Sequence, residues 1–190
     1  NFILQAEICQ RLFDRDPDRA AEELQNLKTA ASVTFQKVRD FIFDLRPMML
    51  DDLGVASTVR TYAKSFQQKN DIEVSEDIAG EDRRLETHRE VLIFRSIQEL
   101  MVQARDYASP AHIDIKLDLT SDPIRIVVED DGRGFDPTPI FEAEEGAHLD
   151  GRGEALLTLK EKMELIGGKI AIESSEAEGT TVRLEIPAGE

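Results

Sequence analysis

Apolar side chains at the start of the chain recur with the period of a one-sided helix. Between residues 1 and 13 they fall three and four positions apart, which is the spacing of an amphipathic helix. Pro17 suits the first turn of a following helix, with Asp16 as a candidate N-cap. A second apolar stripe then continues as far as Pro47, where we expect that helix to end. The pattern predicts a helical hairpin over residues 1–48.

Each helix of this hairpin has one apolar face, so the pair alone does not close a core. The stripe of the second helix consists of Leu24, Leu27, Ala31, Val38, Phe41 and Leu45. A second copy of the chain would cover both faces and complete a four-helix bundle. We therefore expect a homodimer that forms through the N-terminal helices.

After Pro47 the pattern becomes that of a mixed helix and strand domain. Helices are expected over about 55–67, 90–107 and 156–166, the last followed by a glycine C-cap. Short apolar alternations predict strands near 72–75, 113–119, 124–128, 170–172 and 182–186, of which the second and third form an antiparallel hairpin. Residues 49–190 are therefore expected to form an α/β sandwich, in which three helices cover a mostly antiparallel sheet of about five strands.

Composition and charge narrow the range of partners. The chain has 190 residues, 41% of them hydrophobic, and its 39 acidic residues against 23 Lys and Arg give a formal charge of −16. An acidic surface repels nucleic-acid phosphates and anionic lipids, so we expect no nucleic acid partner and no membrane contact. A single cysteine and the lack of any apolar run near the ~20 residues of a membrane span favour a cytoplasmic protein. Because the sequence begins within a helical pattern, we expect it to be part of a longer protein.

Glycine-rich segments mark the candidate chemistry of the second unit. In Asp130-Asp-Gly-Arg-Gly134 the aspartate ends a buried strand, so its carboxylate could accept a hydrogen bond from a buried amine. Gly132 and Gly134 would then let the backbone approach a planar ring. The same five residues also suit a tight turn that closes a hairpin. Taken alone they favour the turn, because short glycine motifs are weak signals.

Two later segments have the same ambiguity. Gly151-Arg-Gly153 precedes the helix expected from Leu156 and could place backbone N–H groups at a triphosphate. It could equally be the hinge of a lid formed by the long polar loop 135–152. Gly179-Thr180-Thr181 lies between two strands and, taken alone, is most simply a tight turn.

Four features in chain order resemble a known family. They are Asp44-Leu-Arg-Pro47 with Leu50-Asp-Asp-Leu-Gly54, a helix carrying Glu99, the segment Asp130-Asp-Gly-Arg-Gly134, and the late Gly167-Gly168 with Gly179-Thr180-Thr181. Together they resemble the sensor histidine kinases of the DegS, NarX and DesK type, whose ATPase domain is shared with Hsp90 and gyrase. The resemblance covers essentially the whole chain. It implies an α+β fold, with a dimerisation and phosphotransfer hairpin at 1–48 and an ATP-binding domain at 49–190.

The resemblance also assigns roles to individual residues. Asp130 would bind the adenine amino group, Glu99 would act as the catalytic residue that orients water or a metal ligand, and Gln103 would contact the nucleotide and ligate Mg²⁺. The other nucleotide-binding residues would be Gly132, Gly134, Gly151, Gly153, Gly179, Thr180 and Thr181. The implied reaction passes the γ-phosphate of ATP to a histidine and then to an aspartate of a NarL-type response regulator.

Three positions depart from the family pattern near the phosphates. Gln103 stands where the family has asparagine, and its extra methylene displaces an oxygen that Mg²⁺ requires at ~2.1 Å. Asp106 replaces a cation with an anion, and Ala155 replaces a glycine at which the backbone should approach phosphate closely. The alternative is therefore a pseudokinase, a dimeric docking scaffold whose nucleotide pocket has degenerated.

None of the histidines falls in the predicted bundle. His88 lies just before the Glu99 helix, His112 begins a strand and His148 is in the polar loop. By resemblance, the phosphoacceptor would lie one or two helical turns before Asn1, at ~3.6 residues per turn. We therefore expect that this chain does not autophosphorylate by itself.

Overall fold

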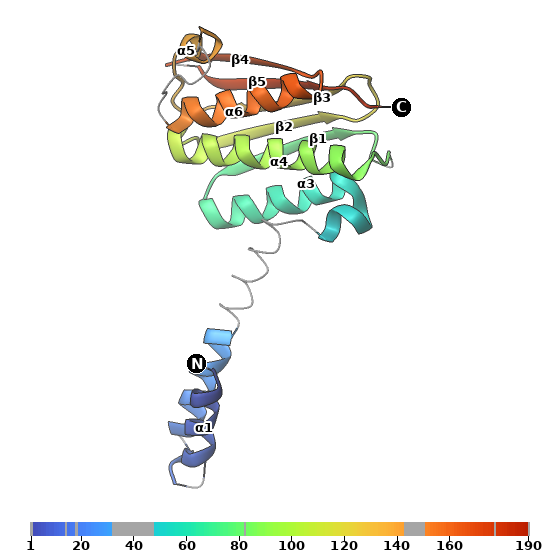
Figure 1. Ribbon diagram of the computed structural model, residues 1–190. Coiled ribbons are helices and arrows are strands. Elements are labelled where there is room, and N and C mark those ends of the chain that lie inside the picture. The colour runs from blue at the N-terminus through green and yellow to red at the C-terminus, as the bar shows by residue number, and fades with distance from the viewer. Residues whose placement is uncertain are drawn as a thin grey trace. The chain divides into compact units, whose positions relative to one another are not determined.

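The computed structural model describes residues 2–13, 15–17, 19–31, 48–81, 83–142, 151–176 and 178–189. The chain divides into two compact units, Asn1–Met48 and Met49–Glu190 (Figure 1). None of the described helices is long and apolar enough to cross a membrane.

The first unit begins as the hairpin that the apolar pattern predicts. Helix α1 spans Phe2–Leu12, and a second helical run covers residues 19–31. The N-cap of this run is as expected, because Oδ1 of Asp16 accepts a hydrogen bond from the backbone N–H of Arg19 at 3.2 Å. The expected course of the helix to Pro47 lies outside the described residues.

Apolar side chains of the first unit are open to solvent. The exposed fraction is 39% for Ile8, 72% for Phe13 and 57% for Leu24. The later members of the predicted stripe, Val38, Phe41 and Leu45, lie outside the described residues. Within the described part of the hairpin, apolar surface therefore remains for another chain to cover.

Among the described residues, five strands form one sheet in the second unit. They are β1 Glu73–Ala79, β2 His112–Asp118, β3 Ile124–Asp130, β4 Lys169–Ser175 and β5 Gly179–Ile186. Their spatial order is β1-β2-β3-β5-β4, with β1 and β2 parallel and the other three pairings antiparallel. The expected mixed, mostly antiparallel sheet is confirmed, as is the hairpin of β2 and β3.

Helices cover one face of this sheet (Figure 1). They are α3 Met48–Asn70, α4 Thr87–Gln103 with a π-helical extension η1 Ala104–Ala108, and α6 Gly151–Leu165. The short helix α5 Thr138–Glu142 packs beside α6. Along β3 the apolar residues Ile124, Ile126 and Val128 are buried, whereas Arg125 and Glu129 at alternate positions are exposed. This alternation confirms the predicted two-layer sandwich, with one face of the sheet packed and the other solvated.

The first helix of the second unit starts earlier than the sequence predicts. It begins at Met48 rather than near residue 55, because Gly54, with φ 76°, joins two helical pieces across a kink. Arg84 holds this kinked start, since its Nη2 donates to the backbone oxygens of Leu50 at 3.2 Å and Asp51 at 3.1 Å. The Leu-Asp-Asp-Leu-Gly segment is therefore a structured helix start.

Helix α6 also begins earlier than expected. It starts at Gly151 rather than Leu156, so Gly153 lies in the first helical turn instead of a preceding loop. The predicted polar loop 135–152 contains helix α5. Residues 143–150, with His148, lie outside the described residues. The signal for this early start is obscured because glycine is a poor helix former.

Candidate functional site

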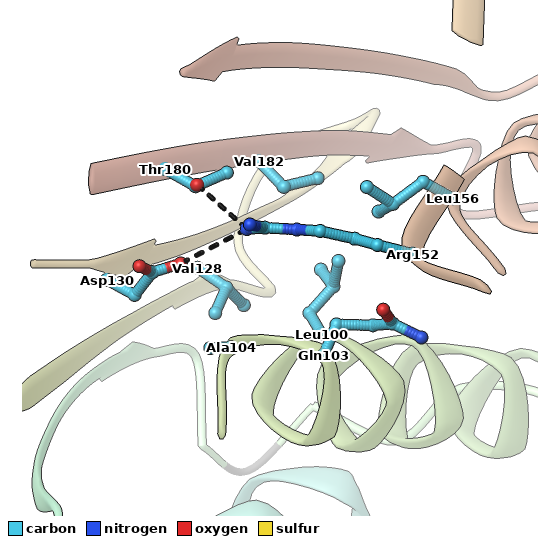
Figure 2. Close-up of a pocket in the computed structure, with 9 residues that line it drawn as sticks. All are labelled: Leu100, Gln103, Ala104, Val128, Asp130, Arg152, Leu156, Thr180 and Val182. Atoms are coloured by element: carbon cyan, nitrogen blue, oxygen red, sulfur yellow. Dashed lines mark hydrogen bonds and ion pairs between the residues drawn. The ribbon is translucent and has the colours of Figure 1, made fainter. Parts of the chain in front are cut away.

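Two cross-strand pairs form the floor of a pocket at the end of the central strands. The antiparallel register of β3 and β5 sets Asp130 opposite Thr180 and Val128 opposite Val182. Residues directly opposite one another in a sheet point to the same face. Figure 2 shows these side chains on the two strands, with Asp130 and Thr180 on either side of an arginine side chain.

Helices α4 and α6 supply the walls of the pocket. Leu100, Gln103 and Ala104 are spaced by three and four residues, so they share one face of α4 and its π-helical extension. Arg152 and Leu156 have the same relation on α6. The space left between these walls and the floor is about 10 Å³, close to the minimum for one water molecule.

The side chain of Arg152 fills the pocket. Only 6% of the residue is exposed. Its Nη2 donates a hydrogen bond to Oγ1 of Thr180 at 2.9 Å and lies 3.9 Å from Oδ2 of Asp130. Its Nη1 donates to the backbone oxygen of Arg133 at 3.3 Å, and its Cζ lies 4.1 Å from the ring centroid of Phe135. The guanidinium therefore has partners at the end of β3, in the following loop and at the start of β5.

The Asp130 carboxyl is equally buried, with 5% of the residue exposed. Burial raises its pKa, while the backbone N–H of Gly132, which donates to Oδ1 at 3.0 Å, and the charge of Arg152 act in the opposite direction. Because burial dominates, the ionised carboxylate is less well stabilised here than in water. An additional N–H donor in the pocket would therefore be bound favourably.

Only one of the two polar atoms of the Gln103 carboxamide has a hydrogen-bond partner among the described residues. Its Nε2 donates to Oε1 of Glu99 at 2.9 Å. Its Oε1 is buried and has no hydrogen-bond partner among the described residues, and Figure 2 shows this oxygen on the side of Arg152. A carboxamide oxygen is one of the oxygen ligands that hard divalent cations such as Mg²⁺ accept. The carboxamide oxygen of Gln103 could therefore serve as one protein ligand for Mg²⁺.

The glycines after Asp130 accommodate protein backbone. A Cβ at Gly132 would lie 2.6 Å from the backbone oxygen of Ala108, and a Cβ at Gly134 would overlap the backbone oxygen of Ser175. The expected approach of a planar ligand to these two glycines stays a prediction, and the structure gives them a packing role as well. They let the loop after β3 pack against the π-helical turn and the β4–β5 hairpin.

Two of the other expected residues lie outside the pocket. Glu99 is exposed on α4 and reaches the site only through Gln103. Thr181 is opposite Glu129 in the register, so strand alternation places it on the solvated face of the sheet. Its expected contact with the nucleotide stays a prediction, and this position does not support it. Gly179 begins β5 with φ 76°, a conformation that strains other residues.

The remaining positions lie on η1 and at the start of helix α6, where Tyr107 meets Gly151. A Cβ at Gly151 would lie 2.5 Å from the hydroxyl oxygen of Tyr107, so this glycine leaves room for the tyrosine. Asp106 accepts a hydrogen bond from Nε of Arg105 at 2.7 Å. The anion that departs from the family pattern is thus paired with its own neighbour. Ala155 is half-buried on α6.

Sequence reasoning missed Arg152 and Phe135 as members of the site. It treats Arg152 only as the spacer between two glycines, although a cation in the first turn of a helix opposes the helix dipole. That conflict is a signal that a tertiary contact holds the side chain. Phe135 directly follows the glycine segment, but nothing in its sequence position shows that its ring meets an arginine.

Comparison with known proteins agrees with this architecture. Residues 88–190 match the family described as "Histidine kinase-, DNA gyrase B-, and HSP90-like ATPase", and residues 1–50 match the family described as "Histidine kinase". The chain is 31% identical over 188 residues to the signal transduction histidine-protein kinase/phosphatase DegS of Brevibacillus brevis, and 32% identical over 191 residues to DegS of Bacillus subtilis. Each match covers 98% of this chain but only 46% and 48% of those proteins, so the chain spans about half the length of these relatives.

A solved structure has the same fold. The histidine kinase domain of the Erythrobacter litoralis EL346 blue-light activated histidine kinase aligns with a TM-score of 0.56 at 16% identity, over 97% of this chain and 93% of that one. Three observations indicate the same family: the order of the motifs, the mixed sheet with its helices and the two family matches. The chain therefore belongs to the histidine kinases of the histidine kinase-, DNA gyrase B- and HSP90-like ATPase family, and its relatives include kinases of the DegS type.

Proposed function

We propose that this chain is the transmitter region of a two-component sensor kinase, in which residues 49–190 bind ATP as the phosphoryl donor. The observation that carries the proposal is the buried Asp130 carboxylate, which faces a pocket between the sheet and the helices with Thr180 directly opposite. The match of residues 88–190 to an ATPase family supports ATP as the ligand.

Asp130 would accept a hydrogen bond from the adenine amino group. Such a bond to an ionised, poorly solvated acceptor is stronger than one between neutral groups. Thr180 would offer its hydroxyl to the same edge of the ring, and apolar side chains from α4 and the strands would contact its faces. Asp130 is thereby the proposed source of specificity for adenine.

The phosphates would lie toward the start of α6, near Gly151 and Gly153. Backbone N–H groups in the first turn of a helix favour anions. Mg²⁺, when bound with the phosphates, supplies charge neutralisation for phosphoryl transfer. Gln103 would offer its unpaired carboxamide oxygen as a ligand, and Glu99 would hold that carboxamide in position through its hydrogen bond to Nε2.

Residues 1–48 would dimerise and present the acceptor. The histidines of this chain are His88, His112 and His148, and none of them lies within residues 1–48. The proposed phosphoacceptor is therefore a histidine outside the 190 residues of this sequence. The phosphoryl group would pass from it to an aspartate of a NarL-type response regulator. A cytoplasmic location would give the kinase access to ATP and to that regulator.

Asp130→Asn tests the adenine contact. The substitution keeps an acceptor for the Gly132 N–H but removes the charge, so we expect adenine nucleotides to bind at least about tenfold more weakly, as for loss of a charge-assisted hydrogen bond. Isothermal titration calorimetry with ADP measures the change. Glu129→Gln is the matched control, because Glu129 precedes Asp130 on β3 and is exposed on the opposite face. Unchanged affinity in Asp130→Asn would place the adenine elsewhere.

The departures at Gln103, Asp106 and Ala155 favour a second candidate, a docking pseudokinase without nucleotide turnover. A triple variant with Gln103→Asn, Asp106→Lys and Ala155→Gly separates the two. We expect the unaltered chain to bind Mg-ATP and the variant to bind about tenfold more tightly, a difference of about 1.4 kcal/mol, because it restores a cation and closer approach near the phosphates. Calorimetric titration measures both. Binding by the triple variant alone would support the pseudokinase.

Light scattering and a substitution in the apolar stripe test the proposed dimer. Light scattering at micromolar concentration should give twice the monomer mass, and Leu24→Asp should shift the protein to the monomer because it places a charge in the apolar interface. Gln25→Asp is the control, since Gln25 is also exposed on the same helical run and outside the predicted stripe. A monomer for the unaltered chain would contradict the proposed bundle.

A further inference from the structure

Arg152 occupies the place that the adenine ring would need. The pocket that contains Asp130 and Thr180 retains a space of only about 10 Å³ beside the arginine. Sites for small molecules and cofactors enclose roughly 300–1,000 Å³. A purine therefore cannot enter while the Arg152 side chain stays where it is.

The contacts of Arg152 are those that an adenine would make. Its guanidinium is planar and presents N–H donors at its edge, as the amino edge of adenine does. One edge bonds to Thr180 and lies beside the Asp130 carboxylate, and one face stacks on Phe135. The protein group and the ligand would compete for the same acceptor atoms.

No local feature of helix α6 explains this placement. Arginine is rarely buried to this extent without a partner of opposite charge, and a cation in the first helical turn is disfavoured by the helix dipole. Arg152 lies in that first turn and is 6% exposed. Its contacts with the ends of β3 and β5 hold it there, and these belong to the pocket.

We propose that Arg152 is a built-in competitor of the nucleotide: it closes the adenine subsite of the ligand-free protein and must withdraw before adenine can bind. This inference rests on the proposed function, because it concerns the same subsite. The apparent dissociation constant then equals the intrinsic one divided by the open fraction. The strength of the Arg152 contacts sets the nucleotide concentration at which the site fills.

The test compares adenosine, ADP and Mg-ATP as calorimetric ligands for the unaltered chain, Arg152→Ala and Arg152→Lys. If the closed form holds about 90% of the free protein, Arg152→Ala should bind all three about tenfold more tightly. Arg152→Lys should fall between, because an ammonium cannot engage both Asp130 and Thr180 in the fork geometry of a guanidinium. Arg125→Ala is the charge-matched control, since Arg125 is an exposed residue of β3 that pairs with Glu185.

The three ligands separate competition from a direct contact with phosphate. Adenosine carries no charge, so tighter adenosine binding by Arg152→Ala supports competition at the ring. Weaker ADP and Mg-ATP binding with unchanged adenosine binding would make Arg152 a phosphate ligand and overturn the proposal. Binding by the unaltered chain with no gain in Arg152→Ala would also overturn it and leave the proposed function intact. No binding by any variant would refute both.

A second measurement needs no nucleotide. Thermal unfolding of the ligand-free chain is compared for Arg152→Ala, Asp130→Asn and the double variant. If Arg152 lies against Asp130, Arg152→Ala should lower the unfolding midpoint by several degrees in the unaltered background and by clearly less in the Asp130→Asn background. Additive effects of the two substitutions would mean that the contact is absent and would overturn the proposal.

Discussion

Burial of the Asp130 carboxylate at the end of β3 is the constraint on which the second unit depends. A carboxylate removed from water must find donors, and burial here raises its pKa. The backbone N–H of Gly132 supplies one partner, which requires the chain to turn immediately after the strand. The glycines of that turn then allow the loop to pack against the π-helical turn and the β4–β5 hairpin. The geometry of the pocket thus follows from satisfying one acidic side chain.

The same constraint explains why the ligand-free pocket is filled. A neutral amine on a ligand and a guanidinium on the protein are alternative partners for Asp130. The structure uses the guanidinium of Arg152, which also gains Thr180 and the ring of Phe135. A site that is satisfied in the absence of ligand is more stable than an open one, and binding must offset that stability. If adenine binds at Asp130 as proposed, affinity and stability oppose each other at this pocket.

Much of the fold follows from residue patterns that act locally. Strict alternation identifies β2 and β3 because one face of each strand is buried and the other solvated. The start of α6 cannot be predicted from the local pattern, because Gly151 and Gly153 are poor helix formers whose helical state depends on tertiary packing. The same limit applies within the site. The alternation along β3 predicts that Asp130 ends a buried strand, which the structure confirms. The burial of the Arg152 side chain cannot be predicted in this way, because it depends on contacts with residues far away in sequence. Thr180 and Thr181 are neighbours in one motif, yet strand alternation places their side chains on opposite faces of the sheet.

The kinked start of α3 shows a sequence motif whose glycine has a conformational role. Its Leu-Asp-Asp-Leu-Gly residues resemble a family signature, and the structure shows the reason for the glycine. Gly54 adopts a positive φ, and a Cβ there would lie 3.3 Å from Cδ of Arg84. Arg84 in turn holds the first helical turn through backbone oxygens. The glycine of this motif is therefore explained by the backbone geometry of the kink.

The most direct test of competition between Arg152 and adenine is a pair of crystal structures, one of the ligand-free chain and one with a non-hydrolysable Mg-ATP analogue. We predict that Arg152 lies between Asp130 and Thr180 in the ligand-free structure, and that in the complex the adenine takes this place with its amino group on the Asp130 carboxylate. An adenine bound elsewhere, or an Arg152 side chain that stays in the pocket beside bound nucleotide, would contradict it.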